Sequence, residues 1–200
     1  NWLAKRAPGR LPIAFDKADM AVMAASAMAL VAWVQLPETQ VTAWLAIVAG
    51  ALNTWRLSRW AGDRTAAEPL VLILHVAFAF VPIGFVLLAL SILSPSLVAP
   101  TGALHGWTAG AIGLMTLAVM TRASLGHTGR ALVASPALQA VYAVAFAAAL
   151  ARICAVLHPE WNEALLLIAA FAWSAAFLGF ASLYAPILCL KPSRAVRTPT

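Results

Sequence analysis

Long apolar stretches alternate along this chain with short segments that hold charges, Pro or Gly. Six stretches have 17 or more residues: Ala18–Leu36, Val41–Leu57, Leu70–Leu93, Gly102–Thr121, Pro136–Leu157 and Ala164–Leu190. Backbone N–H and C=O groups have no water partners in hydrocarbon, so stretches of this length must form helices there. The pattern predicts an all-α fold, a polytopic membrane helix bundle with about six transmembrane helices.

The second stretch, Val41–Leu57, is the weakest of the six. Its 17 residues only just meet the lower limit for crossing a hydrocarbon core of about 30 Å. It can cross if Arg56 and Arg59 extend along the helix and place their charged heads in the interface.

The distribution of charge favours six crossings. Six spans place twelve of the thirteen Lys and Arg on one side of the membrane and leave Arg152 on the other. If the second stretch did not cross, the split would be five against eight. Because cytoplasmic loops carry the excess of Lys and Arg, we expect a multi-pass protein with both ends of this segment cytoplasmic.

Composition agrees with a membrane location and narrows the class of protein. Hydrophobic residues make up 63% of the chain, charged residues 10%, and the mean hydropathy is +0.89. An ordinary soluble domain is about a quarter charged, so we exclude secreted, cytosolic and nucleic-acid-binding proteins. Residues 1–17 are expected to be a cytoplasmic connector, 18–190 the six-helix transmembrane domain, and 191–200 a basic cytoplasmic tail. The first residue is Asn1, and we expect a piece of a longer protein.

Histidine and arginine are the polar residues left to carry chemistry in the spans. No phosphate-binding loop, paired carboxylates or nucleophile motif is present, and no acidic residue lies well inside a stretch. An intramembrane polar residue faces protein and needs a partner, which singles out His75 in the third stretch. We place six residues in one layer near the cytoplasmic side: Asn53, Arg56, His75, Arg122, His127 and Arg130.

His105 opens the fourth stretch on the other side of the membrane, close in depth to Arg152. It stands beside Gly102, Gly106 and Gly110, whose spacing allows another helix to approach closely. About 30 Å of helix separates His105 from His127, so these two cannot share a metal.

Imidazole is the usual protein ligand for haem iron and also binds copper. His75 is the leading candidate ligand, and His127 shares its side of the membrane. A structural alternative for His75 is a neutral ring that is hydrogen-bonded to Asn53 or to a carbonyl. The glycines of the loop Gly126–Arg130 could shape it so that His127 and Arg130 face the bundle.

The segment HGWTAGAIGLMTLAVMTRASLGHTGR (residues 105–130) resembles the NnrS family of bacterial inner-membrane proteins, and TRASLGHTGR is its most specific part. Further matches are AGALNTWRLSRWAG, LILHVAFAFVPIGF and AFAWSAAFLGFASLYAPIL. The resemblance implies a haem- and copper-containing membrane protein of nitric oxide metabolism and resistance to nitrosative stress. Because that family has about twice as many helices, this chain corresponds to its C-terminal half.

On this basis the cofactor-binding candidates are His75, His105, His127, Asn53, Arg56, Arg122 and Arg130, and the metal-ligating candidates are His75, His127 and His105. The expected partners are the lipid bilayer, the N-terminal half of the full-length protein, and nitric oxide or a related small ligand. Half of a membrane transporter or permease, or a structural half with its cofactor ligands elsewhere, are the alternative functions. Catalytic residues and enzymatic activity stay unassigned.

Overall fold

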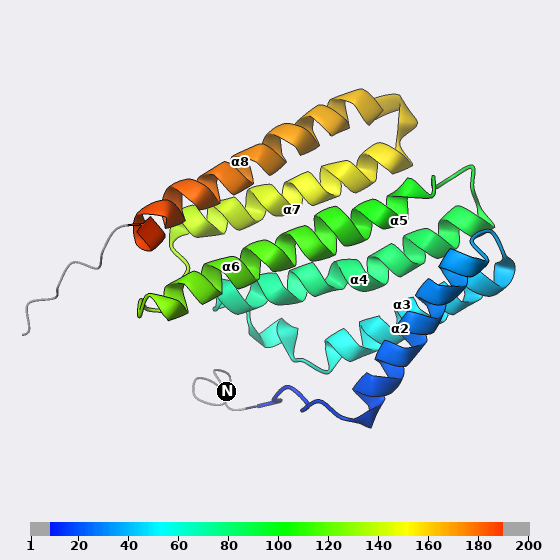
Figure 1. The fold of residues 1–200 in the computed structure, drawn as a ribbon, viewed down its shortest axis with the longest axis horizontal. Coiled ribbons are helices and arrows are strands. Elements are labelled where there is room, and N and C mark those ends of the chain that lie inside the picture. The colour runs from blue at the N-terminus through cyan, green and yellow to red at the C-terminus, as the bar shows by residue number, and fades with distance from the viewer. Residues whose placement is uncertain (1–8, 190–200) are drawn as a thin grey trace, which may run out of the picture.

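The structure is a computed structural model that describes residues 9–189, and it is helical throughout the elements of that range (Figure 1). The long helices are α2 (Lys17–Gln35), α3 (Gln40–Ser58), α4 (Pro69–Leu93), α7 (Pro136–Leu157) and α8 (Asn162–Cys189). Between α4 and α7, the segments α5 (Thr101–His105), η2 (Gly106–Gly113) and α6 (Leu114–His127) join end to end in one continuous rod. Short 3₁₀ turns are η1 (Gly62–Arg64) and η3 (Pro159–Trp161). The expected all-α membrane bundle is confirmed.

Consecutive helices run antiparallel, so the connections alternate between two ends of the bundle (Figure 1). One end holds the start of α2, the connections α3–α4 and α6–α7, and the end of α8. We call this the basic end, because Arg10, Arg56, Arg59, Arg64, Arg122 and Arg130 lie at or near it. The opposite end holds the other three connections and Arg152. The charge asymmetry read from the sequence is therefore also an asymmetry of the folded bundle.

With α5, η2 and α6 counted as one continuous helix, residues 9–189 form six long helices, and five of these are long and apolar enough to cross a membrane. The helix that falls short is α3, which corresponds to the weak second stretch of the sequence. Polar groups on α3 explain its lower hydropathy, and they bond within the protein: Thr54 donates to the Gly50 carbonyl, and Asn53 donates to Ser26 and to the Ala49 carbonyl. Because α3 lies antiparallel to both α2 and α4, it still returns the chain to the basic end (Figure 1).

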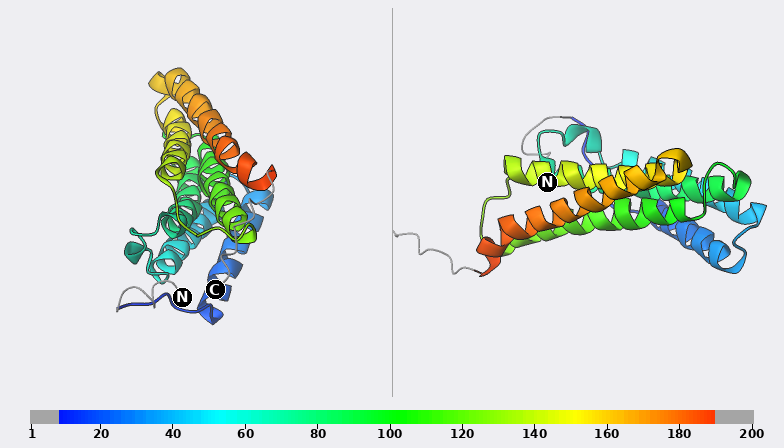
Figure 2. Two further views of the ribbon diagram at one scale, coloured as in Figure 1. Left: turned by 90° about the vertical axis from the view of Figure 1, so that its left-hand side faces the viewer. Right: turned by 90° about the horizontal axis from the view of Figure 1, so that it is seen from above.

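The helices follow one another across the bundle, with α4 and the α5–η2–α6 rod at its centre (Figure 2). The pairs α2–α3 and α7–α8 flank this centre on either side. Helices α2 and α8 are the least buried of the membrane-length helices, and large apolar side chains such as Val34 and Phe171 point outward from them. Lipid is the natural solvent for such faces.

Local sequence signals account for the helix ends. Asp16 caps α2 through a capping box with Asp19, and Ser135 caps α7, whose first residue is Pro136. One boundary differs from the sequence-based expectation: the fourth helix continues past Thr121 to His127. His127 therefore ends a helix instead of standing in a loop. Of the expected terminal segments, only residues 9–17 are described, and the basic tail 191–200 lies outside the described residues.

Of the three glycines predicted to allow close packing, Gly106 and Gly110 bring the central rod close to α4, whereas Gly102 faces Val98 and Val156. A Cβ at Gly106 would lie 3.2 Å from the Gly84 Cα, and a Cβ at Gly110 would lie 2.3 Å from Phe80 Cδ1. α4 continues as one helix through Pro82. The close packing is confirmed, and it holds the central pair together where lipid offers no hydrophobic drive.

Candidate functional site

A groove at the opposite end of the bundle contains a histidine and an arginine. It lies between the α5–η2 segment, α7 and α8, and its cavity volume is about 450 Å³. We call it the His105 groove. Its lining residues are His105, Thr108, Ala109, Ala148, Arg152, Leu166, Ala169, Ala170 and Trp173. The sequence-based prediction that His105 and Arg152 lie at the same depth agrees with this placement.

The helix that carries His105 changes its geometry directly after that residue. Residues Gly106–Gly113 form a π-helix, whose wider turn shifts the phase of the side chains on either side. Gly113 closes this segment, and a Cβ there would lie 2.2 Å from the Trp173 ring. The indole of α8 thus packs directly on the rod backbone and forms one wall of the groove. Such π-segments occur often at functional sites.

The chemical character of the His105 groove is an imidazole and a guanidinium in apolar surroundings. Four alanines line it, and their small side chains leave the volume open. Within the described residues, no carboxylate pairs with Arg152 and no hydrogen bond engages the His105 ring. A neutral imidazole can ligate a metal, and an unpaired arginine can bind an anionic group of a ligand. These residues fit a flat, largely apolar cofactor that has acidic substituents.

His75 lies at the basic end and is engaged in packing. Its Nδ1 is 3.0 Å from the Val71 carbonyl oxygen, one turn earlier in α4. The Trp60 ring contacts it edge-on, and a Cβ on Gly62 would lie 2.6 Å from its Cδ2. These contacts agree with the hydrogen-bonded packing role, and they leave Nε2 as the ring nitrogen through which His75 could bind a metal.

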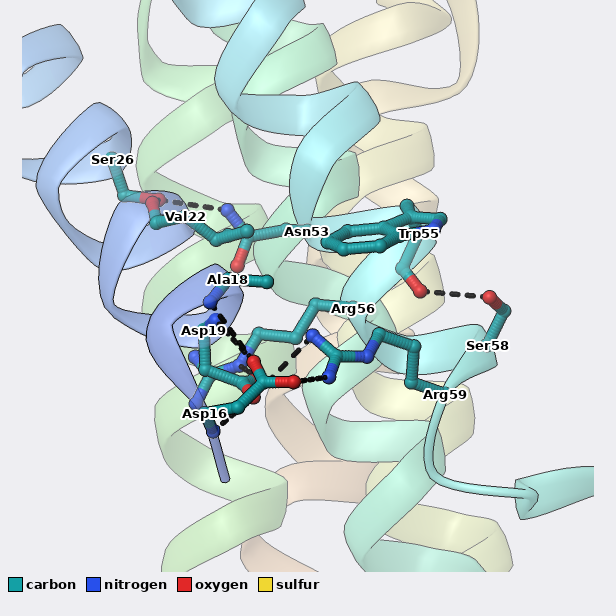
Figure 3. Close-up of polar contacts among 10 residues, drawn as sticks. All are labelled: Asp16, Ala18, Asp19, Val22, Ser26, Asn53, Trp55, Arg56, Ser58 and Arg59. Carbon is teal, nitrogen blue, oxygen red and sulfur yellow. Dashed lines mark hydrogen bonds and ion pairs between the residues drawn. The ribbon is translucent and has the colours of Figure 1, made fainter. Parts of the chain in front are cut away.

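Asn53 and Arg56 belong to a polar network between α2 and α3 (Figure 3). Asn53 Nδ2 donates to Ser26 Oγ at 2.8 Å, and Arg56 Nε donates to Asp19 Oδ1 at 2.9 Å. Arg56 also lies over the rings of Trp60 and Phe78. Through these contacts the two side chains hold α2 against α3.

Two carboxylates complete this network, and sequence reasoning missed them. Asp19 is 3% exposed, although it stands in the first turn of α2. Arg59 Nη2 donates to Asp16 Oδ2 at 2.5 Å, and its Nη1 lies 3.4 Å from Asp19 Oδ2. The hydrogen bond from Arg59 lowers the pKa of the Asp16 carboxyl below its ordinary value. The sequence contained a signal for this network. Two aspartates stand at the start of one helix, and two arginines stand at the end of the next, antiparallel helix.

Arg122 and His127 come together in a second groove, at the basic end between α4 and α6. His75 is not among the residues that line it. Arg130 lines a different cavity beside Tyr184 and Ile187 of α8. In the connection that follows α6, Gly129 adopts a positive φ of 66°, as a shaped turn requires, whereas Gly126 is helical.

The predicted site residues therefore fall into separate places. The structure brings His105 near Arg152 and places Arg122 and His127 of α6 along one groove. It joins Arg56 to the Asp19 carboxylate and Asn53 to Ser26, both on α2. Across residues 9–189, no three His, Cys, Asp or Glu side chains gather as a metal site. A haem needs only one or two axial protein ligands, so a single well-placed histidine is sufficient for it.

Comparison with known proteins places this bundle in a family. No curated relative and no solved structure matches the chain. The family model described as NnrS protein matches residues 1–191, which is nearly the whole chain. The match includes the central rod, the His105 groove and the charged network between α2 and α3. The chain belongs to the NnrS family.

Proposed function

We propose that this chain is the haem-binding part of an inner-membrane protein that acts in the nitric oxide response and in resistance to nitrosative stress. Membership of the NnrS family supports the biological role, through what the resemblance of the sequence implies. The observation that carries the haem assignment is the His105 groove. It combines an imidazole without a hydrogen-bond partner in the described chain, an unpaired guanidinium and apolar walls at the edge of a lipid-embedded bundle.

Each residue of the groove has a role in this proposal. His105 would hold the iron through its imidazole, and Arg152 would pair with an acidic substituent of the haem. Ala148 and Ala169 leave room for a flat ring, and Trp173 would provide an aromatic surface for it. When bound, haem iron supplies a coordination position for a small diatomic gas. The protein fixes the ring orientation and limits the access of water.

An apolar groove at the bundle surface suits a gas as the ligand. The groove opens between helices whose outer faces are apolar, so an uncharged diatomic molecule can reach it from the bilayer. No polar channel is needed for such a route. Among the described residues, no carboxylate lines the groove, which is consistent with a site that moves neither protons nor cations.

The proposal changes the order of the candidate histidines. Sequence reasoning placed His75 first and His127 beside it, whereas the surroundings of His105 suit a cofactor better. Of the arginines predicted to bind the cofactor, Arg56 is engaged with Asp19, and Arg122 and Arg130 lie at the basic end.

The test is the absorption spectrum of the intact protein purified in detergent, compared with those of single variants. The wild-type protein should show a Soret band. His105→Ala should abolish or shift the band, and Arg152→Gln should weaken haem retention with a smaller spectral change. His158→Ala is the matched control, because His158 is an exposed histidine at the same end of the bundle.

Two results would contradict the proposal. A wild-type protein that lacks a Soret band after haem supplementation does not bind haem. A band that is unchanged in His105→Ala but altered in His75→Ala or His127→Ala would move the site to the basic end.

A further inference from the structure

The groove lined by Arg122 and His127 combines two basic side chains with apolar walls. It lies at the basic end between α4 and α6, under the connection that leads to α7, with a cavity volume of about 510 Å³. We call it the Arg122 groove. Its lining residues are Leu74, Val119, Arg122, Ala123, Gly126, His127 and Leu132.

Charge and apolar surface are ordered by depth in the Arg122 groove. His127 ends α6, and Arg122 lies about 7.5 Å further along the helix axis at 1.5 Å per residue. Val119 lies about 4.5 Å deeper still, and its side chain is exposed. From the end of the bundle inward, the groove thus changes from cationic to apolar. A phospholipid at a membrane interface has the matching order, with its headgroup outermost and its acyl chains below.

Arg122 has no counter-charge within the described residues, unlike Arg56 and Arg59 at the same end of the bundle. Arg56 and Arg59 are neutralised by Asp19 and Asp16. Within residues 9–189, no carboxylate forms an ion pair with Arg122. An exposed arginine at membrane depth requires an anionic partner or water, and basic sites between helices are known to bind anionic headgroups.

Gly126 of α6 leaves open space in the Arg122 groove. Around an added Cβ at Gly126, no heavy atom lies within 4 Å, in contrast to the tightly packed Gly106 and Gly110 of the same rod. Gly126 therefore does not serve helix packing in the described bundle. Its missing side chain leaves space beside the charges of Arg122 and His127.

We propose that the Arg122 groove binds an anionic phospholipid, with the phosphate at the Arg122 guanidinium and the upper acyl chain along Leu74 and Val119. His127 provides a second donor to the headgroup. The site is independent of haem binding, because the His105 groove lies at the other end of the bundle.

The test uses the intact protein in detergent, stripped of lipid and titrated with phosphatidylglycerol or with phosphatidylcholine of the same acyl chains. Native mass spectrometry counts the bound lipids. The wild-type protein should prefer phosphatidylglycerol. Arg122→Gln should weaken phosphatidylglycerol binding by about fivefold, the effect of one basic residue near a membrane surface, and should leave phosphatidylcholine binding unchanged. Arg130→Gln is the matched control, since Arg130 lines a different cavity at the same end.

A second pair of variants tests the space without changing any charge. Gly126→Phe should fill the groove and abolish the preference for phosphatidylglycerol, whereas Gly126→Ala should keep most of it. Circular dichroism checks that both variants stay helical. If Gly126→Phe is misfolded, Gly126→Leu replaces it.

Three results would overturn the proposal. Equal phosphatidylglycerol binding by the wild-type protein and Arg122→Gln would exclude Arg122 as the contact. Equally tight binding of glycerol 3-phosphate, which has no acyl chain, would indicate a site for free phosphate esters. Loss of the Soret band in Arg122→Gln, together with displacement of lipid by haem, would assign the groove to the cofactor.

Discussion

Buried carboxylate–arginine contacts tie α2 to α3 at the basic end. Asp19 is almost fully buried and pairs with Arg56, while Asp63 forms an exposed pair with Arg10. These two pairs contain the same chemical groups in different surroundings. Burial decides how much each pair contributes to stability. Water screens the exposed pair, and it solvates the remaining charge when one partner is removed.

Asp19→Asn should therefore destabilise the protein by about 3 kcal/mol, since it leaves the Arg56 guanidinium without its carboxylate in a buried place. Asp63→Asn should cost less than about 1 kcal/mol. Thermal or denaturant unfolding in one detergent measures both. Equal losses for the two variants would mean that the α2–α3 contact is open to solvent.

The Asp16 carboxyl predicts how stability depends on pH. Its pKa is lowered in the folded protein, chiefly because Arg59 donates a hydrogen bond to the charged form. The stabilisation is present above the unfolded pKa of about 3.9 and is lost as the pH falls through the lower, folded value. The melting temperature should thus drop on acidification below about pH 4. Asp16→Asn should reduce this drop in melting temperature at acid pH. A drop as steep as that of the wild-type protein would show that Asp16 is not responsible for it.

At the scale of elements, the central contact is the approach of the α5–η2–α6 rod to α4. Gly106 faces the Gly84 backbone, and Gly110 faces Phe80. The Trp107 indole on the same rod donates to the Val81 carbonyl of α4 at 3.0 Å. The two helices are thus joined by backbone proximity and by one side-chain hydrogen bond.

Gly110→Ala should destabilise the bundle by about 1–3 kcal/mol, because the new methyl group overlaps the Phe80 side chain close to the Cβ of Phe80, where that side chain cannot move away easily. Gly126→Ala is the matched control on the same rod. It meets open space and should be neutral or stabilising by about 0.5 kcal/mol. Thermal unfolding in detergent separates the two, and an unchanged Gly110→Ala protein would show that the rod is not held against α4 in this way.

At the scale of the whole molecule, the alternating connections predict the membrane topology. Cysteines introduced at Glu38 and Ser96 should be labelled from one side of the membrane, and cysteines at Ala67 and Ala131 from the other. All four positions are exposed. The native Cys154 and Cys189 are replaced first, and a membrane-impermeant maleimide is applied to sealed vesicles. The basic end, with Ala67 and Ala131, is expected to be cytoplasmic.

Labelling of Glu38→Cys and Ala67→Cys from the same side would show that α3 does not cross. That outcome matters because α3, although long enough, falls short of the hydropathy of a membrane span. Its packing between α2 and α4 is the reason to expect a crossing, since a neighbour on each side covers its polar groups.

The apolar pattern by itself determined much of this protein. It predicted the helical class, the approximate bounds of six helices and the close approach at Gly106 and Gly110. Each follows from a local rule: hydrocarbon requires helices, and small residues permit contact between backbones. The residues of the NnrS motif likewise identified the family. The distribution of Lys and Arg predicted the two ends of the bundle, because the connections that lack these residues all lie at the same end.

Only the tertiary structure decided the partners of the polar residues. Arg56 and Arg59 looked like arginines that extend to the membrane interface, but α2 places Asp16 and Asp19 against them. His75 was the leading candidate ligand from the sequence, and the fold packs the turn at Gly62 against its ring. His105 became the preferred candidate ligand because a π-helical segment, α7 and α8 form a groove around it. Such contacts join residues that are distant in the chain, so the order of residues alone does not specify them.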